Sequence, residues 1–477
     1  MENIILQIVQ ETAKKYMEYY EANGIHDLSD MATGFKNISE GMAREILSAF
    51  VSSADDVIRC AREERLGDSI KIRESNVPRT LLTAIGEFNY KRTYYDTPGG
   101  REYIVDSILG VASYERIDGG MSARLVQTAA THSYEKSADI VTGGKVSRQS
   151  VRNKLMNTGE VAYVPGRAEY TPQALHIFAD EDHVNLQDGK NTIVSLVTVS
   201  AGKRHVCKGR NELIDPFHVQ GCGIKAEALW EYVYALCAEK YDMREVKRIY
   251  VYGDGASWIE KSEDVFPDSM HVLDEYHFKK RMRGLFSGKI CSTRSIAAYS
   301  AIQRNDKGLF DRIVQNMLSE VKEKMPEGEE RVRKIKRVME NAAYIINHWG
   351  AVQNRKREDI IGSCTEAMIS HVLSARLSRN PMGWSKEGLS KMSMVRVFVL
   401  NGGTIEPADT LAWKHNSDKY KVITRLEKYE AIVKGQQDKI SKDAKDWRWF
   451  EVDDLISGKT TGTKVALDAL ARTREIA

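Results

Sequence analysis

Segments with the patterns of strands and helices alternate along the middle of this 477-residue chain. ALHIFADEDHV and TIVSLVTVSA are apolar runs of strand length, and AEALWEYVYALCAEKY has the length and composition of a buried helix. VKRIYVYGDGASWI and SMHVLDEYHFKKRM each fit a strand, a tight turn and the start of a helix. Strands that alternate with helices predict an α/β sheet that contains parallel strands.

The predicted sheet domain is interrupted. Residues 281–360 carry long charged helical patterns and no clear strand, and SCTEAMISHVLSARLS then resumes as a helix. We therefore expect a first part of the sheet domain over 170–280, an all-helical insertion over 281–360 and completion of the domain over 361–400. A C-terminal helical tail is expected over 401–477.

The N-terminal part predicts a DNA-binding region. Residues 1–75 have apolar residues at helical spacing, and within 76–165 TLLTAIGEFNYKRTYYD predicts a β-hairpin followed by the turn signal TPGG. MSARLVQTAATHSYEKSADIVTGG and RQSVRNKLMN then follow with the spacing of a helix-turn-helix, whose last helix Ser147 would cap. Exposed side chains of that helix suit phosphates and base edges: Arg148, Gln149, Arg152 and Asn153. A helical bundle with a polar surface fits the same pattern.

The small net charge excludes the class of strongly basic proteins that bind nucleic acid over their whole surface. The formal charge is only +3, from 70 basic and 67 acidic residues, so any DNA-binding surface must be local. Basic residues do concentrate at Lys279 and Lys280, over 331–337 and over 355–357. A solvated helix face explains each run equally well.

Six cysteines without a CxxC pair fit a reducing compartment and no disulfide framework. The N-terminus is too acidic and its apolar stretch too short for a signal peptide, and no run approaches the length of a membrane span. We therefore expect a cytoplasmic protein.

Acidic residues at strand ends are the strongest indication of chemistry. Asp180 follows the apolar run LHIF and Asp254 follows IYVY, each where we expect a strand to leave the sheet. Ligands of open α/β sheets bind outside the carboxyl ends of strands, so the two acids are expected to converge, with Glu366 joining them from a helix.

Three carboxylates offer the oxygen ligands that Mg²⁺ and Mn²⁺ prefer. Two such ions can activate the attacking hydroxyl and stabilise the leaving oxygen of an in-line displacement at phosphorus. Gly253 and Gly255 flank Asp254 and would permit a tight turn. The same acids also fit a helix cap, a common GDG turn and a first-turn charge on a helix dipole, and Asp182 competes with Asp180.

Several blocks resemble the ISLre-type bacterial insertion-sequence transposases and, more distantly, the Mutator-like DDE transposases. These blocks are FADEDHV, YVYGDGASWI, HVLDEYHFKKR and GSCTEAMISHVLSARLSRNPMGWS, and they occur in the family's order across most of the chain. The resemblance implies an RNase H-like mixed sheet flanked by helices, with an α-helical insertion between the second Asp and the Glu. It places the catalytic, metal-binding acids at Asp180, Asp254 and Glu366, with Asp182 and Glu387 as competitors.

Further site residues are expected from the same blocks. His277, in a block resembling the family's D-x-[YF]-H motif, is expected beside the catalytic acids, and Arg376 is expected to clamp a phosphate. Trp258 and Trp384 fit either a flipped base or the core, and Ala367 stands where many relatives have glycine.

The implied function is a DDE transposase that uses two Mg²⁺ or Mn²⁺ ions to hydrolyse DNA at transposon ends and to transfer the freed 3′-hydroxyl into target DNA. Its expected partners are double-stranded DNA and further copies of itself in a synaptic complex at the nucleoid. An RNase H-like nuclease or resolvase without strand transfer and a non-catalytic DNA-binding regulator are the alternatives.

Overall fold

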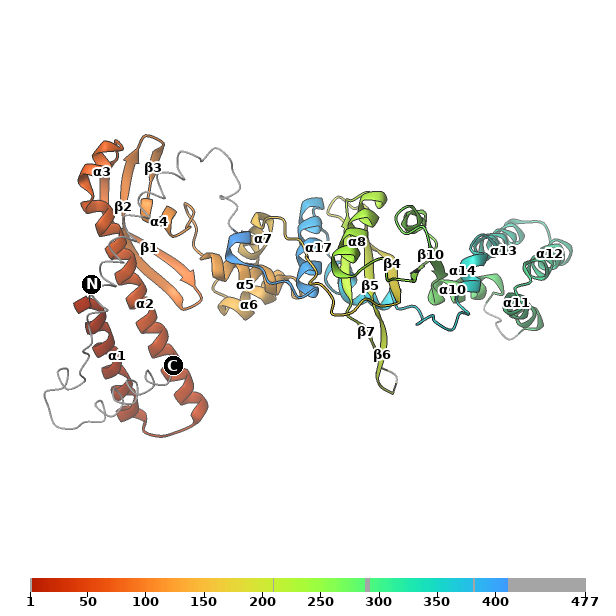
Figure 1. Cartoon of the computed structure of the whole chain (residues 1–477), viewed down its shortest axis with the longest axis horizontal. Helices are drawn as coiled ribbons and strands as arrows, with labels where there is room; N and C mark the ends of the chain where they lie inside the picture. Colours follow the sequence, from red (N-terminus) through yellow and green to blue (C-terminus); the bar gives the residue numbers. More distant parts are fainter. Residues whose placement is uncertain (1, 209, 288–291, 381, 411–477) are drawn as a thin grey trace. The chain divides into compact units, whose positions relative to one another are not determined.

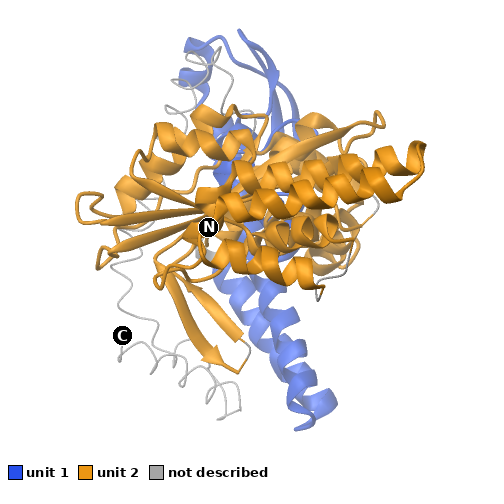
Figure 2. Ribbon diagram, turned by 90° about the vertical axis from the view of Figure 1, so that its right-hand side faces the viewer, with its two compact units in different colours: residues 1–125, 406–477 blue, residues 126–405 orange. Residues whose placement is uncertain are grey.

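The computed structural model describes residues 2–208, 210–287, 292–380 and 382–410. The chain divides into two compact units, one formed by residues 1–125 with 406–477 and the other by residues 126–405 (Figure 2). Most of the predicted C-terminal helical tail, from residue 411 onward, lies outside the described residues.

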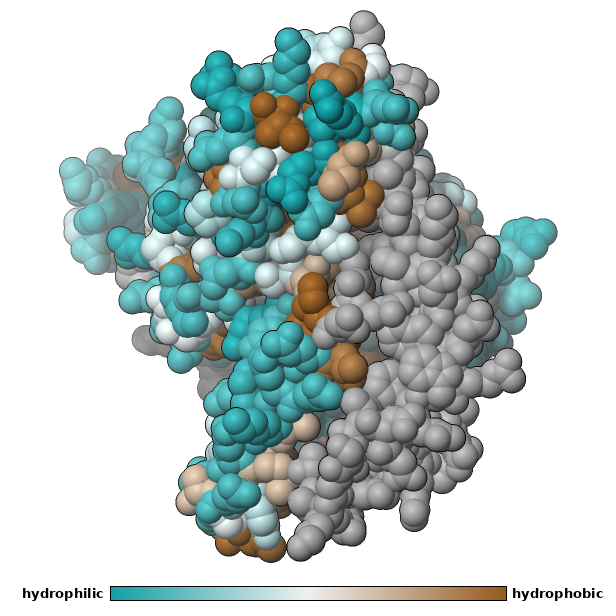
Figure 3. Space-filling model, turned by 90° about the vertical axis from the view of Figure 1, so that its left-hand side faces the viewer, coloured by the Kyte–Doolittle hydropathy of each residue, from teal (hydrophilic) through white to brown (hydrophobic). Residues whose placement is uncertain are grey.

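Unit 1 combines long helices with a three-stranded antiparallel sheet of order β1-β2-β3. The helices predicted before residue 75 are present, and the face of this unit in Figure 3 is mainly hydrophilic with separate apolar spots. Its elements are α1 (Glu2–Asn23), α2 (Leu28–Cys60), α3 (Arg62–Gly67), β1 (Lys71–Thr83), β2 (Gly86–Thr97), β3 (Gly100–Glu102), α4 (Ile104–Ile108), most of α5 (Gly119–Ala129) and η3 (Pro407–Thr410).

The predicted hairpin is confirmed, and so is the TPGG turn that follows it. β1 and β2 pair up to Thr83 and Gly86, so the tight turn lies between these residues, and the TPGG turn joins β2 to β3. Asp55 of α2 fixes the helix to this sheet, because its buried carboxylate accepts hydrogen bonds from the Thr93 amide (2.9 Å) and hydroxyl (2.6 Å).

Unit 2 begins with the helix pair that the sequence predicted. α6 (Tyr134–Thr142) ends at Gly143, whose φ of +61° is the left-handed conformation that favours glycine at a helix C-terminus. α7 (Arg148–Asn157) begins after Ser147, whose hydroxyl accepts a hydrogen bond from the Ser150 amide.

A five-stranded mixed sheet flanked by helices forms the centre of unit 2 (Figure 1). Its order is β10-β9-β4-β5-β8; β5 runs antiparallel to both of its neighbours, and β4, β9 and β10 are parallel. The strands are β4 (Ala174–Asn185), β5 (Asn191–Ser200), β8 (Phe217–Cys222), β9 (Arg248–Gly253) and β10 (Ser269–Leu273).

The two faces of β4 have different roles. Leu175, Ile177 and Ala179 are fully buried in the core cluster that α8 (Ala226–Lys240) covers. Because side chains alternate along a strand, His176, Phe178 and Asp180 lie on the opposite face. Phe178 packs there against Tyr252 and the 360–364 segment, next to the level at which the carboxylates begin.

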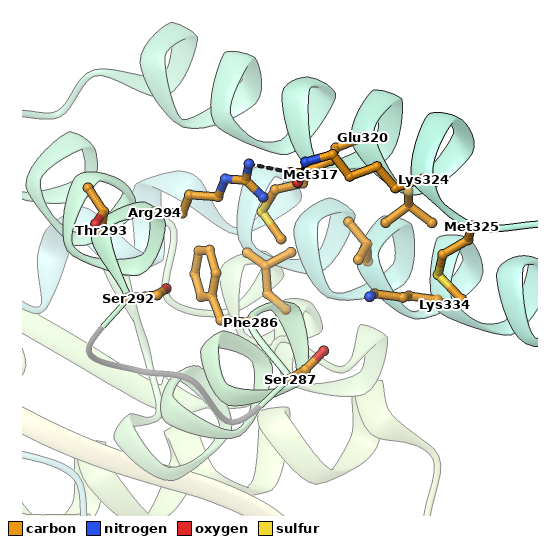
Figure 4. Close-up of a pocket in the computed structure, with 13 residues that line it drawn as sticks. Phe286, Ser287, Ser292, Thr293, Arg294, Met317, Glu320, Lys324, Met325 and Lys334 are labelled. Atoms are coloured by element: carbon orange, nitrogen blue, oxygen red, sulfur yellow. Dashed lines mark hydrogen bonds and ion pairs between the residues drawn. The ribbon is translucent and has the colours of Figure 1, made fainter.

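The described part of the segment after β10 consists of helices from Glu275 to Asn354, and residues 355–360 form turns and irregular chain. It has its own core, which includes Phe310, Ile345 and Trp349. A hollow of about 500 Å³ lies among these helices, where Glu320 contacts Arg294 and Lys324 above an apolar floor (Figure 4). The helices are α10 (Glu275–Leu285), α11 (Thr293–Gln303), α12 (Lys307–Lys324), α13 (Glu329–Asn347) and α14 (Trp349–Asn354).

A helical stretch over residues 365–377 returns to the sheet and packs along β4. It consists of α15 (Thr365–Met368), the π-helical segment η2 (Ile369–Ser374) and α16 (Ala375–Leu377). α17 (Lys386–Leu400) then packs against β8 and α7.

Three short elements complete unit 2: α9 (Ser257–Glu260), η1 (Lys261–Asp264) and a separate two-stranded ribbon of β6 (Gly202–Cys207) and β7 (Arg210–Ile214). Among the described residues, no helix has both the length and the apolar character needed to cross a membrane.

Candidate active site

Strand register brings the first two predicted acids together. β4 pairs in parallel with β9 up to Phe178 and Tyr252, and continuing that register by two residues places Asp180 opposite Asp254. Adjacent strands lie about 4.8 Å apart, so the two side chains are neighbours on one face. Our expectation that Asp180 stands where a strand leaves the sheet is wrong, because β4 continues to Asn185; it is β9 that ends, at Gly253, and so opens the edge of the sheet.

The turn around Asp254 requires both of its glycines. A Cβ on Gly253 would lie 2.7 Å from Ile259 Cδ1, and one on Gly255 would lie 2.2 Å from His348 Nε2. Gly255 also has a φ of +81°, which L side chains rarely adopt. Asp254 closes the turn itself, since its Oδ1 accepts a hydrogen bond of 2.9 Å from the Ala256 amide. The turn therefore holds the carboxylate in one place.

Glu366 joins the two aspartates, although it is far from them in sequence. It lies in the first turn of α15, an element that packs on β4, and its side chain is exposed. The charges of both Asp254 and Glu366 act on Asp180 and raise its pKa. Asp180, Asp254 and Glu366 therefore lie close enough for their charges to interact.

Asp180 is held in an environment that disfavours its charge. Burial is the main cause that raises its pKa, to about 6, and repulsion from Asp254 and Glu366 adds to it. His277 and the Glu181 amide oppose this shift. A cluster of carboxylates that repel one another in this way is an environment that a cation would stabilise.

Of the two competing acids, Asp182 has a structural partner. Both oxygens of the buried Asp182 accept hydrogen bonds of 2.9 Å from the Ser378 hydroxyl, which ties β4 to the end of the 365–377 helix. Glu387 lies in the first turn of α17. In the part of the chain that the structure describes, Asp180 and Asp254 each use only Oδ1, and only for a nearby backbone amide. Asp180 is therefore the better ligand candidate than Asp182.

A further acid at this edge, Asp274, anchors the site. It follows β10 at the same level as Asp254, because Leu273 pairs with Gly253. Its buried carboxylate accepts hydrogen bonds from the His277 amide (3.0 Å) and Nδ1 (3.2 Å), from the Thr365 hydroxyl (2.6 Å) and from the Ser363 hydroxyl. Although burial acts to raise the pKa of Asp274, these hydrogen bonds outweigh burial and lower it.

His277 lies beside the carboxylates, as expected. Its hydrogen bond to Asp274 is the main cause that raises its pKa, and the charges of Asp180 and Asp254 add to that effect. The sequence located Asp274 and His277 in one block but did not reveal that Asp274 connects His277 to the start of the Glu366 helix.

Two residues of the helical insertion support the GDG turn and were not predicted. The Tyr344 hydroxyl donates to the Asp254 carbonyl, and His348 Nε2 lies 3.3 Å from the Gly255 carbonyl oxygen. Both come from the end of α13, about 90 residues after the turn, and no sequence pattern connects them to it. A hollow of about 400 Å³, lined by His348 and His271 among others, adjoins this side of the turn.

The predicted DNA-contacting residues have mixed outcomes. On α7, Arg148, Gln149 and Asn153 are exposed and Arg152 is half-buried; on α10, Lys279 and Lys280 are exposed. They therefore remain available for contact with DNA.

Arg376, however, is buried, and our expectation of a phosphate clamp there is wrong. Its Nε donates to the Ala129 carbonyl (2.8 Å), and its guanidinium lies over the rings of Tyr134 and Trp384. Trp384 is itself buried, and Trp258, half-buried, stacks on Trp230 and donates to Glu181. These contacts are structural.

The donor set fits a hard divalent cation, because Asp180, Asp254 and Glu366 offer oxygen ligands only. Among the described residues, no group of three or more His, Cys, Asp or Glu side chains is arranged so that it could hold a metal ion. Glu366 is exposed at the rim. The two aspartates are therefore the fixed part of the candidate site.

We expect Asp180→Asn to stabilise the metal-free protein at neutral pH. A carboxyl whose pKa is raised on folding contributes stability that is present below its unfolded value of 3.8 and is lost as the pH rises through about 6. The variant should therefore unfold with a free energy about 1–3 kcal/mol higher than wild type near pH 7 and equal to it near pH 4.

Chemical denaturation in EDTA across this pH range measures the effect. Asp188→Asn, which neutralises an exposed acid of the β4–β5 turn, is the matched control and should change stability by less than about 0.5 kcal/mol. If the difference in free energy of unfolding between wild type and Asp180→Asn is the same near pH 4 and near pH 7, the pKa of Asp180 is not raised on folding.

Comparison with known proteins finds one family. Residues 21–412 match the uncharacterised protein family UPF0236. A UPF0236 protein of Caldanaerobacter subterraneus subsp. tengcongensis is 33% identical over 439 residues, which cover 90% of this chain and 91% of the relative. Its name joins eleven locus designations.

Two further UPF0236 proteins of the same organism are similar. One is 31% identical over 411 residues, which cover 85% of this chain and 86% of the relative. The other is 31% identical over 438 residues, covers 90% and 91%, and has a name that joins four locus designations.

Proposed function

We propose that this chain, which belongs to the uncharacterised protein family UPF0236, is a DNA transposase that cleaves DNA at the ends of a mobile element and joins the freed 3′-hydroxyl to target DNA. The observation that carries the proposal is the sheet edge at which the charges of Asp254 and Glu366 act on Asp180. Among the described residues, the two aspartates accept hydrogen bonds only from nearby backbone amides. Carboxylates held together against their mutual repulsion are typical of a metal-dependent phosphoryl-transfer site.

The architecture supports an RNase H-like catalytic domain. Its centre is a mixed five-stranded sheet with helices on both faces, and the second and third acids are separated by the helices α10 to α14. This is the arrangement that the resemblance to DDE transposases implies. The insertion does more than lengthen the chain, since Tyr344 of α13 supports the Asp254 turn.

Two Mg²⁺ or Mn²⁺ ions, when bound, would polarise the scissile phosphate and activate the attacking oxygen. Asp180 and Asp254 would hold them from fixed positions, and Glu366 would complete the set from the rim. Asp274 keeps His277 in place, and its hydrogen bond raises the pKa of His277, which favours a positive charge at the edge where a phosphate would lie. The protein itself supplies no covalent nucleophile.

Binding of double-stranded DNA would use local basic surfaces, because the net charge of the chain is small. The exposed side chains of α7 suit a recognition helix, and Lys279 and Lys280 lie on α10, the same helix that carries His277. Since an element has two ends, we also propose that copies of this chain assemble on them.

The names of the relatives agree with this proposal. Two of them join eleven and four locus designations. A protein encoded at several loci is what an element that copies or moves its own gene would leave behind.

The test is a cleavage and joining assay with the full-length protein. The substrate is a duplex that carries the inverted repeats flanking its gene, with a supercoiled plasmid as target. We expect Mg²⁺-dependent cleavage that exposes a 3′-hydroxyl, followed by joining to the plasmid, and no reaction in EDTA. Cleavage without joining would favour the RNase H-like nuclease or resolvase instead, and binding without any reaction would favour a DNA-binding regulator.

A further inference from the structure

A basic two-stranded ribbon extends from the sheet of unit 2 (Figure 1). It is formed by β6 and β7 together with Lys208, and we refer to it as the β6–β7 ribbon. Between residues 202 and 214 it carries Lys203, Arg204, Lys208 and Arg210 against the single acid Glu212, a formal charge of +4 − 1 = +3. The whole chain has the same net charge of +3, so the ribbon is a strong local concentration of positive charge.

The base of the ribbon lies on the face of the sheet that carries the carboxylates. Leu213 packs against the cluster that contains Phe178 and Tyr252. Lys203 Nζ donates a hydrogen bond of 2.9 Å to the carbonyl of Ile361, in the segment that leads into the Glu366 helix. The ribbon is therefore fixed next to the candidate active site rather than to a remote part of the unit.

Beyond its base the ribbon is exposed. All described residues from Lys203 to Asn211 are exposed, including the apolar Val206 at 46%. An isolated two-stranded hairpin is only marginally stable in water, so a ribbon that stands away from the core gains from a partner.

The charged side chains of the ribbon are arranged before any partner binds. Arg204 faces Glu212 across the ladder, and Glu212 contacts both Arg204 (3.2 Å) and Arg210 (2.9 Å). The guanidinium side chains are about 70% exposed, and exposed ion pairs contribute little, so both arginines can exchange the carboxylate for a phosphate at small cost.

The shape and the neighbouring polar groups favour duplex DNA over an acidic protein. A two-stranded ribbon fits the major groove, which is about 12 Å wide, and six residues of strand reach about 20 Å. His205 and Asn211 face each other on the next rung of the ladder, on the opposite face of the ribbon from Arg204 and Glu212, and side chains of these types bond to base edges and phosphates.

We propose that the β6–β7 ribbon is a DNA-contacting arm that binds the duplex next to the phosphodiester bond that is cleaved at the carboxylates. This inference rests on the proposed function, because it takes its ligand class from the phosphodiester chemistry of the neighbouring site. It assigns the ribbon a role separate from that of α7, on another element of the same unit.

The test compares two full-length variants that each lose three positive charges. The ribbon variant is Arg204→Gln, Lys208→Gln and Arg210→Gln. The control is Lys307→Gln, Arg312→Gln and Lys322→Gln, on exposed positions of α12. Fluorescence anisotropy with a labelled mixed-sequence duplex of about 30 base pairs, in EDTA and between about 50 and 200 mM salt, gives the affinity and its salt dependence.

We expect the ribbon variant to bind at least about tenfold more weakly at low salt. The plot of the logarithm of the binding constant against the logarithm of the salt concentration should become less steep by about 0.9 for each phosphate contact removed. The control should stay within about threefold of wild type. Equal losses in both variants would show that only total charge matters and would overturn the proposal, as would a wild-type protein that does not bind the duplex.

Cys207 provides a second readout in the unchanged protein. It is exposed on β6, so its reaction with a maleimide should slow severalfold when saturating duplex covers the ribbon. An unchanged rate at Cys207 would contradict the arm. Both binding measurements are made in EDTA, so they do not depend on cleavage. If the protein binds DNA through the ribbon in these measurements but does not cleave DNA in the Mg²⁺ assay, the transposase proposal is refuted and the ribbon assignment is not.

Discussion

Asp254→Asn is expected to abolish Mg²⁺-dependent cleavage while leaving DNA binding within about threefold of wild type. The substitution removes a charge and keeps the shape: an Asn oxygen can still accept the hydrogen bond from the Ala256 amide that closes the turn. What disappears is one of two fixed carboxylates at the sheet edge, and removal of a group that stabilises transition-state charge lowers the rate by about three orders of magnitude. Affinity should persist because contacts with phosphates and bases, not the carboxylates, set it.

A pair of matched variants separates the two candidates for the third acid. Glu366→Gln should lose cleavage to a similar extent, because the charge of Glu366 acts on Asp180. Glu387→Gln removes an equally exposed first-turn acid from α17 and should cleave normally. Gel-shift and cleavage assays on the same preparations decide this, and full cleavage by Asp254→Asn would remove the sheet edge as the site of catalysis.

The sequence predicted those features that arise from local patterns. Alternation of strand and helix segments predicted the sheet, and the position of Asp254 after an apolar run was correct because a parallel strand must end where its turn begins. The same reasoning was wrong for Asp180, since β4 continues by pairing with β5, from Asp180 and Leu196 to Asn185 and Asn191. That continuation depends on a partner strand and cannot be found in the residues of β4 alone.

Features that depend on distant partners were not predictable from pattern. Arg376 has the spacing of an exposed helical residue, yet it is buried because it satisfies the Ala129 carbonyl near the end of α5, while Arg396 donates to the next carbonyl, that of Ala130. Helix ends leave carbonyls without intrahelical partners, and here two arginines from separate helices fill that need. Tyr344 and His348 likewise acquire their roles only because α13 packs beside the GDG turn.

Asp274→Asn is expected to lower the free energy of unfolding by about 3 kcal/mol or more at pH 7. The Asp274 carboxylate is 3% exposed and accepts hydrogen bonds from His277, Ser363 and Thr365. Asn replaces one acceptor oxygen by an NH₂ donor, which would face donors in a buried space. Glu275→Gln changes the adjacent exposed acid, whose surface ion pair with Lys279 contributes little, and should alter stability by less than about 0.5 kcal/mol.

The pH dependence distinguishes a charged anchor from mere packing. Because the pKa of Asp274 is lowered on folding, its contribution is present above the unfolded value of 3.8 and is lost as the pH falls through the lower folded value. Urea denaturation at several pH values should therefore show wild type and Asp274→Asn approaching each other below about pH 4. A gap that is the same at pH 7 and pH 3 would mean that Asp274 acts through shape alone. A difference in stability that becomes smaller at low pH would mean that the charge of Asp274 fixes both His277 and the first turn of the Glu366 helix. The geometry of the site would then depend on a residue outside the proposed metal-binding acids.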